Sequence, residues 1–69
     1  MKVSIKALRV NSGLSQAEAA EKIGVTGRTL QNWEKYKTFP MADQLLKICT
    51  VYGCELSDIF LPDMLAKSE

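Results

Sequence analysis

The chain has 69 residues, of which 46% are hydrophobic and 25% charged, and its formal net charge is +1. This length predicts one small domain over 1–69 whose thin core favours dimerisation, and no apolar run approaches the roughly 20 residues that cross a bilayer. The first residues mix charged and apolar side chains, unlike a signal peptide, so we expect a cytoplasmic protein.

The first predicted helix spans 4–11. Ile5 and Leu8 lie three residues apart, so they share the face that we expect to be buried. Gly13 is expected to end this segment, because glycine readily adopts the left-handed conformation that follows a last helical turn. Leu14 then enters the core.

The second predicted helix spans 15–23 and begins with a capping box, in which Ser15 and Glu18 satisfy each other's backbone amides. Gly24 is expected to end it, and Val25 gives the following turn an apolar anchor. The face expected to pack holds small or branched residues at three-residue steps: Ala17, Ala20 and Ile23.

The third predicted helix spans 26–35, with Thr26 as its cap and Leu30 and Trp33 facing the core. Its other face carries polar side chains at helical spacing: Arg28, Gln31, Asn32 and Lys35. Arginine can donate two hydrogen bonds to guanine, and asparagine can pair with adenine, as major-groove recognition requires. An ordinary solvated face is the alternative. The short turn before this helix favours a helix-turn-helix that reads DNA.

Residues 36–40 (YKTFP) interrupt the helical pattern, and their proline fits a helix start. A fourth helix is predicted over 41–52 and a short fifth over 57–61, which Pro62 stops. The residues expected to be buried are Leu45, Ile48, Cys49 and Tyr52 in the fourth helix, and Leu56, Ile59 and Phe60 in the fifth. The tail, 63–69, is expected to fray, unless Met64 and Leu65 pack against a second subunit. The sequence therefore predicts an all-α, compact five-helix bundle.

Positive charge is concentrated in the first part of the chain. Residues 1–42 contain seven basic and three acidic residues, a net charge of +4, whereas 43–69 contain two basic and five acidic residues, a net charge of −3. The positive part contains the proposed reading helix, as attraction to phosphates requires. Asp43, Glu55 and Asp58 could form an acidic patch that touches RNA polymerase, but a solvated surface is the favoured explanation.

The residues that support catalysis or metal binding are scarce. The chain has no histidine, and Cys49 and Cys54 are five residues apart. This spacing matches neither a CxxC redox pair nor zinc ligands, so we expect both cysteines to pack in the core. We expect no metal, no cofactor, no small-molecule ligand and no enzymatic activity.

The run IKALRVNSGLSQAEAAEKIGVTGRTLQNWE, the proline after it and the run LLKICTVYGCELSDIF carry a resemblance that covers nearly the whole chain. They resemble the lambda-repressor-like family of phage repressors, Cro proteins and bacterial regulators of the xenobiotic-response-element type. This resemblance implies a lambda-repressor-like, nucleoid-associated protein that binds double-stranded operator DNA, usually as a homodimer. The helix from about Gly27 to Lys35 would lie in the major groove.

The resemblance also assigns roles by position. It implies base contacts from Arg28 and Asn32, with Gln31 beside them. It implies contacts to the DNA backbone for a set of residues around the reading helix: Gln16, Thr26, Thr29, Lys35 and Lys37. Gln16 is also implied to brace that helix. Apart from the resemblance, Gly27 is expected to let the DNA backbone approach closely, and the Tyr36 hydroxyl is a candidate for a phosphate contact. Simpler alternatives are a solvated helix start for Gln16, a purely capping role for Thr26 and solvated side chains for the lysines.

Three further roles concern the frame of the site. The resemblance implies that Arg9 and Glu34 form a partly buried salt bridge, which joins the first helix to the end of the reading helix, and that Trp33 belongs to the core. In two places the sequence departs from the family. Gly27 stands where relatives often have a base-reading side chain, and Tyr36 stands where glycine is common, so Tyr36 would be strained if its φ were positive.

The leading functional hypothesis is a small repressor that occludes a near-palindromic operator, and activation is an open variant of it. The alternative is a protein-interaction module, such as the DNA-binding antitoxin of a toxin–antitoxin pair. An antitoxin usually needs a segment that covers its toxin, and the seven residues after Pro62 are short for that purpose.

Overall fold

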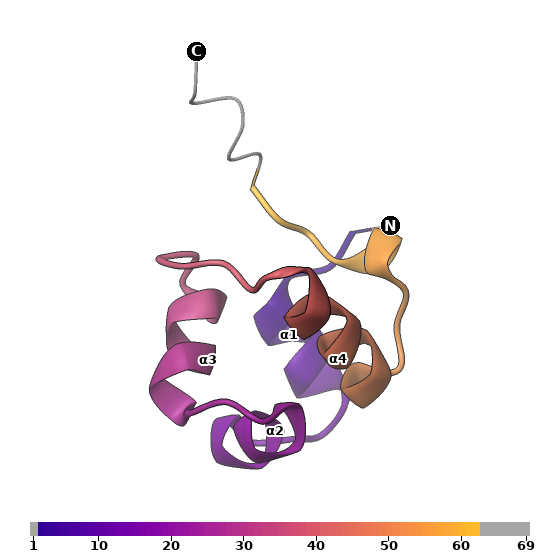
Figure 1. Ribbon diagram of the computed structural model, residues 1–69. Helices are drawn as coiled ribbons and strands as arrows, with labels where there is room; N and C mark the ends of the chain where they lie inside the picture. Colours follow the sequence, from indigo (N-terminus) through magenta and orange to yellow (C-terminus); the bar gives the residue numbers. More distant parts are fainter. Residues whose placement is uncertain (1, 63–69) are drawn as a thin grey trace.

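The computed structural model describes residues 2–62, and helices dominate this part of the chain. In chain order the elements are α1 (Ile5–Asn11), α2 (Gln16–Ile23), α3 (Gly27–Glu34), α4 (Ala42–Tyr52) and the 3₁₀ turn η1 (Leu56–Asp58). α2 packs against both α3 and α4, and α1 packs against α3. Figure 1 shows α3 at one side of the molecule, with no other helix beyond it. The all-helical fold class is therefore confirmed for the described residues.

The four α-helices each begin one residue later than the predicted ranges, because those ranges include the residue that precedes the first helical position. Ser15 and Thr26 cap their helices as predicted. Ser4, Ser15 and Thr26 have extended backbones, and their hydroxyl oxygens accept hydrogen bonds from amides three residues on. The Glu18 carboxylate also accepts a hydrogen bond of 2.9 Å from the Ser15 amide. The predicted capping box is thus confirmed. Met41 takes the corresponding place before α4, where the Gln44 side chain accepts its amide at 2.7 Å.

The four α-helices also end alike, because each is followed by a residue with a left-handed backbone. Three of these residues are the glycines at 13, 24 and 53, with φ of 75°, 92° and 67°. The fourth is Tyr36, with φ of 59°. Around each, backbone amides return to carbonyls of the last helical turn, as in a Schellman motif. Tyr36 is the only residue of this part of the chain, glycines aside, that has a positive φ.

The core lies between the four helices. Ile5, Leu30 and Ile48 are the largest of the fully buried side chains. The other buried apolar residues are Leu8, Ala19, Ala20, Ile23, Trp33, Tyr52 and Ile59. The expected face of α2 was wrong at one position, because Ala17 is exposed and Ala19 is buried instead. The buried stripe follows positions 16, 19, 20 and 23, the spacing of one helix face, and 17 lies beside it.

The predicted fifth helix over 57–61 is absent, and a single 3₁₀ turn takes its place. After Asp58 the chain becomes extended and pairs with the start of the protein through a parallel bridge between Val3 and Ile59. The Phe60 amide donates to the Val3 carbonyl at 2.8 Å, so it cannot continue a helix. Of the three residues expected on the buried face, Ile59 is buried, whereas Leu56 and Phe60 are 50% and 45% exposed.

Three remaining expectations concern the ends and the sulfur atoms. The proposals for the tail, including Met64 and Leu65, lie outside the described residues. Cys49 and Cys54 are free thiols that pack, half-buried, against the core. No helix within 2–62 is long and apolar enough to span a membrane.

Candidate nucleic-acid interface

α3 presents two different faces. Leu30 and Trp33 fix its inner face, with exposures of 0% and 2%. Arg28, Gln31 and Lys35 follow one another at steps of three and four residues and are exposed, so they share the outer face. Because no other helix of residues 2–62 lies beyond α3, this polar face is open to a large partner (Figure 1).

The candidate residues differ in how accessible they are. The exposed ones are Thr26, Gly27, Arg28, Gln31, Lys35 and Lys37, and the half-buried ones are Gln16, Thr29, Asn32 and Tyr36. The two threonines are linked to each other. The Thr26 hydroxyl accepts from the Thr29 amide at 3.1 Å and lies 2.9 Å from the Thr29 hydroxyl. These contacts fix the turn through which the chain enters α3.

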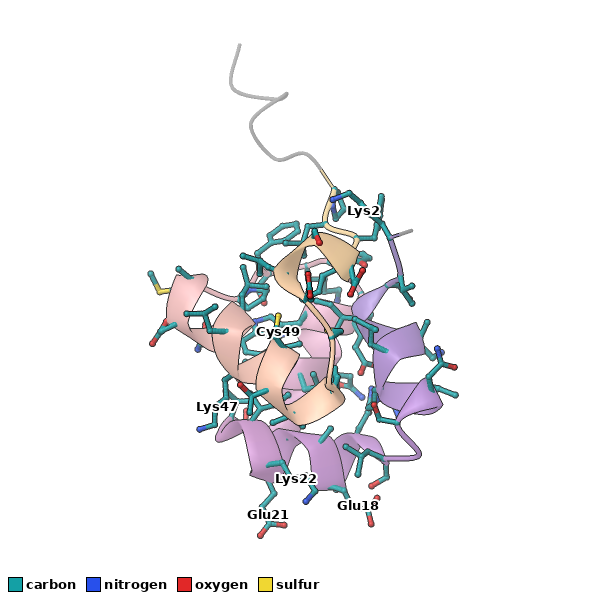
Figure 2. The ribbon with its side chains drawn as sticks, turned by 90° about the vertical axis from the view of Figure 1, so that its right-hand side faces the viewer. Lys2, Glu18, Glu21, Lys22, Lys47 and Cys49 are labelled. Atoms are coloured by element: carbon teal, nitrogen blue, oxygen red, sulfur yellow. The ribbon has the colours of Figure 1, made fainter. Side chains whose placement is uncertain are left out.

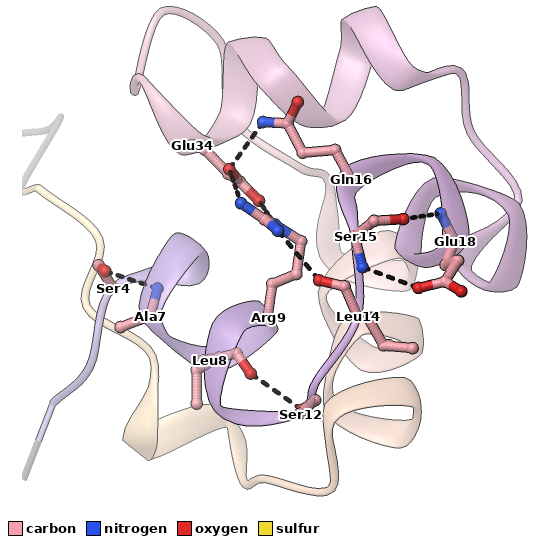
Figure 3. A network of polar contacts seen from close by, with 10 residues as sticks. All are labelled: Ser4, Ala7, Leu8, Arg9, Ser12, Leu14, Ser15, Gln16, Glu18 and Glu34. Atoms are coloured by element: carbon pink, nitrogen blue, oxygen red, sulfur yellow. Dashed lines mark hydrogen bonds and ion pairs between the residues drawn. The ribbon is translucent and has the colours of Figure 1, made fainter.

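A polar brace connects α1, α2 and the end of α3, as Figure 3 shows. Arg9 Nε donates to Glu34 Oε2 at 2.7 Å, and Arg9 Nη2 donates to Oε1 at 3.2 Å. Gln16 Nε2 reaches the same Oε1 at 3.0 Å from the first turn of α2. The remaining guanidinium nitrogen, Nη1, donates to the Leu14 carbonyl at 3.0 Å. One carboxylate therefore joins three helices.

The brace is largely shielded from water, since the Arg9 and Glu34 side chains are 11% and 3% exposed. The hydrogen bond to Glu34 raises the pKa of Arg9, so the guanidinium remains charged. A bidentate arginine–carboxylate pair has a fixed geometry as well as a charge. The pair therefore fixes the orientation of α3 relative to α1 and α2. The direction in which the exposed face of α3 points is fixed with it.

The residues after α3 are fixed by contacts to the end of the described chain. Tyr36 donates its hydroxyl proton to the Phe60 carbonyl at 2.9 Å. The phosphate contact considered for this hydroxyl does not fit the arrangement, because a phosphate oxygen needs a donated proton and Tyr36 has only one. Its ring also contacts Phe39 and Phe60, with centroids 6.1 and 6.0 Å away.

The charge near the outer face of α3 is positive. Arg28, Lys35 and Lys37 are exposed there, whereas Glu34 at the end of the helix is paired with Arg9. The acidic side chains Glu18 and Glu21 project from the outer face of α2, away from the other helices (Figure 2). This surface is therefore suited to a polyanion such as the nucleic-acid backbone.

Sequence reasoning missed one long-range contact of the site. The resemblance already implied that Gln16 braces the reading helix, and the bond from Gln16 to Glu34 agrees with that role. The bond between Tyr36 and Phe60 joins residues 24 positions apart. Periodicity and capping rules describe neighbours within one or two helical turns, so they could not find it.

Comparison with known proteins agrees with this geometry. A family profile described as helix-turn-helix matches residues 5–59. The chain is 37% identical over 60 residues to the HTH-type transcriptional regulator YgzD of Bacillus subtilis, covering 87% of this chain and 91% of that protein. It is 33% identical over 63 residues to an HTH-type transcriptional regulator of Archaeoglobus fulgidus, covering 91% and 90% of the two chains.

A larger relative shares only this part of its length. The regulator PuuR of Escherichia coli is 40% identical over 53 residues, which cover 77% of this chain and 29% of PuuR. The profile match includes α1 to α4 and η1, and therefore both helices of the helix-turn-helix. The chain belongs to the lambda-repressor-like, Cro/C1-type helix-turn-helix family of DNA-binding transcriptional regulators.

Proposed function

We propose that this protein is a sequence-specific repressor that inserts α3 into the major groove of an operator. The observation that carries the proposal is the open polar face of α3, which the partly buried Arg9–Glu34 pair holds at a fixed angle. Arg28 is the first candidate for a bidentate contact to guanine, and Asn32, one turn further along, for a contact to adenine. Gln31 lies between them.

The residues around α3 supply contacts to phosphates. Gln16 uses one amide hydrogen for Glu34 and has a second for a phosphate oxygen. Thr26 and Thr29 share one hydroxyl–hydroxyl hydrogen bond, so one of their two protons remains free. Gly27 has no side chain to hold the DNA backbone away, and Lys35 and Lys37 add affinity that depends on salt.

Repression follows from occlusion by two copies of the chain. In a two-fold dimer the two α3 helices lie about 34 Å apart, one turn of the duplex, and read the two halves of a near-palindromic site. RNA polymerase is then excluded from a promoter that overlaps the site.

The test is selection of bound fragments from a random DNA pool by the wild type and by the double variant Arg28→Ala/Asn32→Ala. We expect the double variant to lose its sequence preference, since each good bidentate contact discriminates by about 1–3 kcal/mol. Its far-UV circular dichroism should be unchanged, because both residues lie outside the core. Lys22→Ala is the matched control, as Lys22 is a basic residue on the outer face of α2, away from the other helices (Figure 2).

Two outcomes would contradict the proposal. If the double variant selects the same fragments as the wild type, the reading surface is not on α3. If the wild type selects no sequence at all, the interaction-module hypothesis takes the place of the repressor. Sedimentation with and without a selected fragment tests the dimer, and a 1:1 complex on DNA would remove the palindromic operator.

A further inference from the structure

Tyr36 occupies a backbone position that disfavours it. The other three α-helices end on glycine at this position, but Tyr36 adopts a left-handed φ of 59° with a full side chain. For a residue that has a Cβ atom, this conformation is disfavoured by a steric clash with the neighbouring carbonyl. The contacts of the Tyr36 side chain must therefore offset the strain.

These contacts form an aromatic clasp, which consists of Tyr36, Phe39 and Phe60. The rings of Tyr36 and Phe39 are stacked, with an angle of 29° between their planes, and Phe60 meets Tyr36 edge-on at 85°. The Tyr36 hydroxyl donates to the Phe60 carbonyl at 2.9 Å. The clasp thus joins the loop after α3 to the extended segment after η1.

The extended segment is itself anchored to the body of the protein. Ile59 is 2% exposed and packs in the core. On either side of it, the Val3 amide donates to the Asp58 carbonyl at 2.7 Å, and the Phe60 amide donates to the Val3 carbonyl at 2.8 Å. The Phe60 end of the clasp is therefore fixed, and it can restrain the loop on the Tyr36 side.

The restrained loop carries two of the proposed phosphate contacts. Lys35 and Lys37 flank Tyr36, and both are exposed. The Lys37 amide donates to the Asn32 carbonyl at 2.9 Å, and the Tyr36 amide donates to the Trp33 carbonyl at 3.0 Å. Both bonds close the left-handed turn at Tyr36, and the side-chain contacts of Tyr36 tie this turn to the extended segment after η1. The clasp therefore sets where the two lysines lie relative to α3.

We propose that Tyr36 is a positioning residue for DNA affinity, which acts through the clasp to hold Lys35 and Lys37 against the phosphates beside α3. This inference rests on the proposed DNA binding. It makes the segment around Phe60, which lies outside the helix-turn-helix, part of the binding machinery.

Two variants of the whole protein test the proposal. Tyr36→Asn removes the ring and the hydroxyl, and asparagine tolerates the left-handed backbone. Tyr36→Phe removes only the hydroxyl. The matched control is Tyr52→Phe, which deletes a buried hydroxyl that has no hydrogen-bond partner among the residues that the structure describes. Affinity for a fragment that the wild type selects is measured at several salt concentrations, well below the unfolding temperature of each variant.

The expected results follow from one or two lost phosphate contacts. Tyr36→Asn should reduce the slope of log affinity against log salt by about one to two, since each phosphate contact contributes about 0.9. Tyr36→Phe should weaken binding in the same direction by about twofold to tenfold, the worth of one hydrogen bond. Tyr52→Phe should bind like the wild type. A residue that only stabilised the fold would leave the salt slope unchanged.

Equal affinity and equal slope for folded Tyr36→Asn and the wild type would overturn the proposal. Hydrogen exchange of the Lys37 amide separates this failure from a failure of the proposed function. If the wild type selects no DNA, exchange in Tyr36→Asn at least about tenfold faster than in the wild type still supports the clasp as the device that positions Lys37. Unchanged exchange contradicts it.

Discussion

The variant Glu34→Gln tests the polar brace most directly, because it keeps the shape of the side chain and removes its charge. Glu34 accepts three hydrogen bonds, two from Arg9 and one from Gln16. The new amide places an N–H group where one carboxylate oxygen stood. In one orientation it opposes Arg9 Nε, and in the other it opposes Arg9 Nη2. If the Gln16 amide rotates, its oxygen can accept from the new N–H group, which restores the contact of Gln16. Arg9 has no acceptor atom, so its lost hydrogen bond cannot be restored in this way.

The loss is thus at least one charge-assisted hydrogen bond in a place shielded from water. Such a bond contributes about 1.5–3 kcal/mol, and the 11% exposure of the Arg9 side chain argues for the lower part of that range. We expect the free energy of unfolding to fall by about 2 kcal/mol. For a domain of this size, this loss lowers the unfolding temperature by roughly 8–16 °C.

Urea denaturation, followed by the fluorescence of the single, buried Trp33, measures this change. Glu21→Gln is the matched control, because Glu21 is exposed on α2, and it should change stability by less than about 0.5 kcal/mol. If Glu34→Gln changed stability no more than Glu21→Gln, the brace would not hold α3 in place. The basis for a fixed reading helix would then be lost.

Two other substitutions have effects that depend on pH. Burial raises the pKa of Tyr52 to about 12, so the fold loses stability to the ionisation of Tyr52 only above about pH 10, and this loss grows as the pH rises through about 12. Tyr52→Phe should remove this alkaline loss and, because the hydroxyl has no partner within residues 2–62, stabilise the protein by about 1 kcal/mol at neutral pH in urea denaturation. The hydrogen bonds from Ser15 lower the pKa of Glu18, so Glu18 stabilises the fold above its unfolded pKa and ceases to do so as the pH falls through the lowered value. Glu18→Gln should therefore flatten the acid side of the stability profile, and an unchanged profile would contradict the assignment. Ser15→Ala should lower stability by about 1 kcal/mol at neutral pH through the loss of the cap.

The parts of the fold that the sequence predicted are those that local chemistry determines. Ser15 and Glu18 indicate a helix start, and the glycines at 24 and 53 indicate helix ends. Capping and left-handed turns involve residues only a few positions apart, so the local sequence is enough to predict them. Leu30 and Trp33 were placed correctly by periodicity. The ion pair of Arg9 with Glu34 came from the family resemblance, since no local rule joins residues 25 positions apart.

The errors arose where distant contacts decide the structure. Periodicity favoured Ala17 over Ala19, because the alanines at 17 and 20 are separated by three residues and the position of the partner helices is invisible in the sequence. The segment after Ser57 has apolar residues at helical spacing. However, the bridge between Val3 and Ile59 pulls it into an extended form. The sequence therefore predicted which residues lie at the candidate interface better than it predicted the long-range contacts that hold them in place.

Gly27, finally, bears on how such a protein can change its target. It lies exposed at the first position of α3, and a Cβ atom built on it would meet no atom within 4 Å. Most core positions reject new side chains because packing is dense, but this position accepts one with no rearrangement. Loss of glycine here would even favour the helix by up to about 1 kcal/mol. Under the proposed function, a single substitution at Gly27 would therefore give a duplicated copy of the gene a new operator, while the stability of its ancestor is preserved.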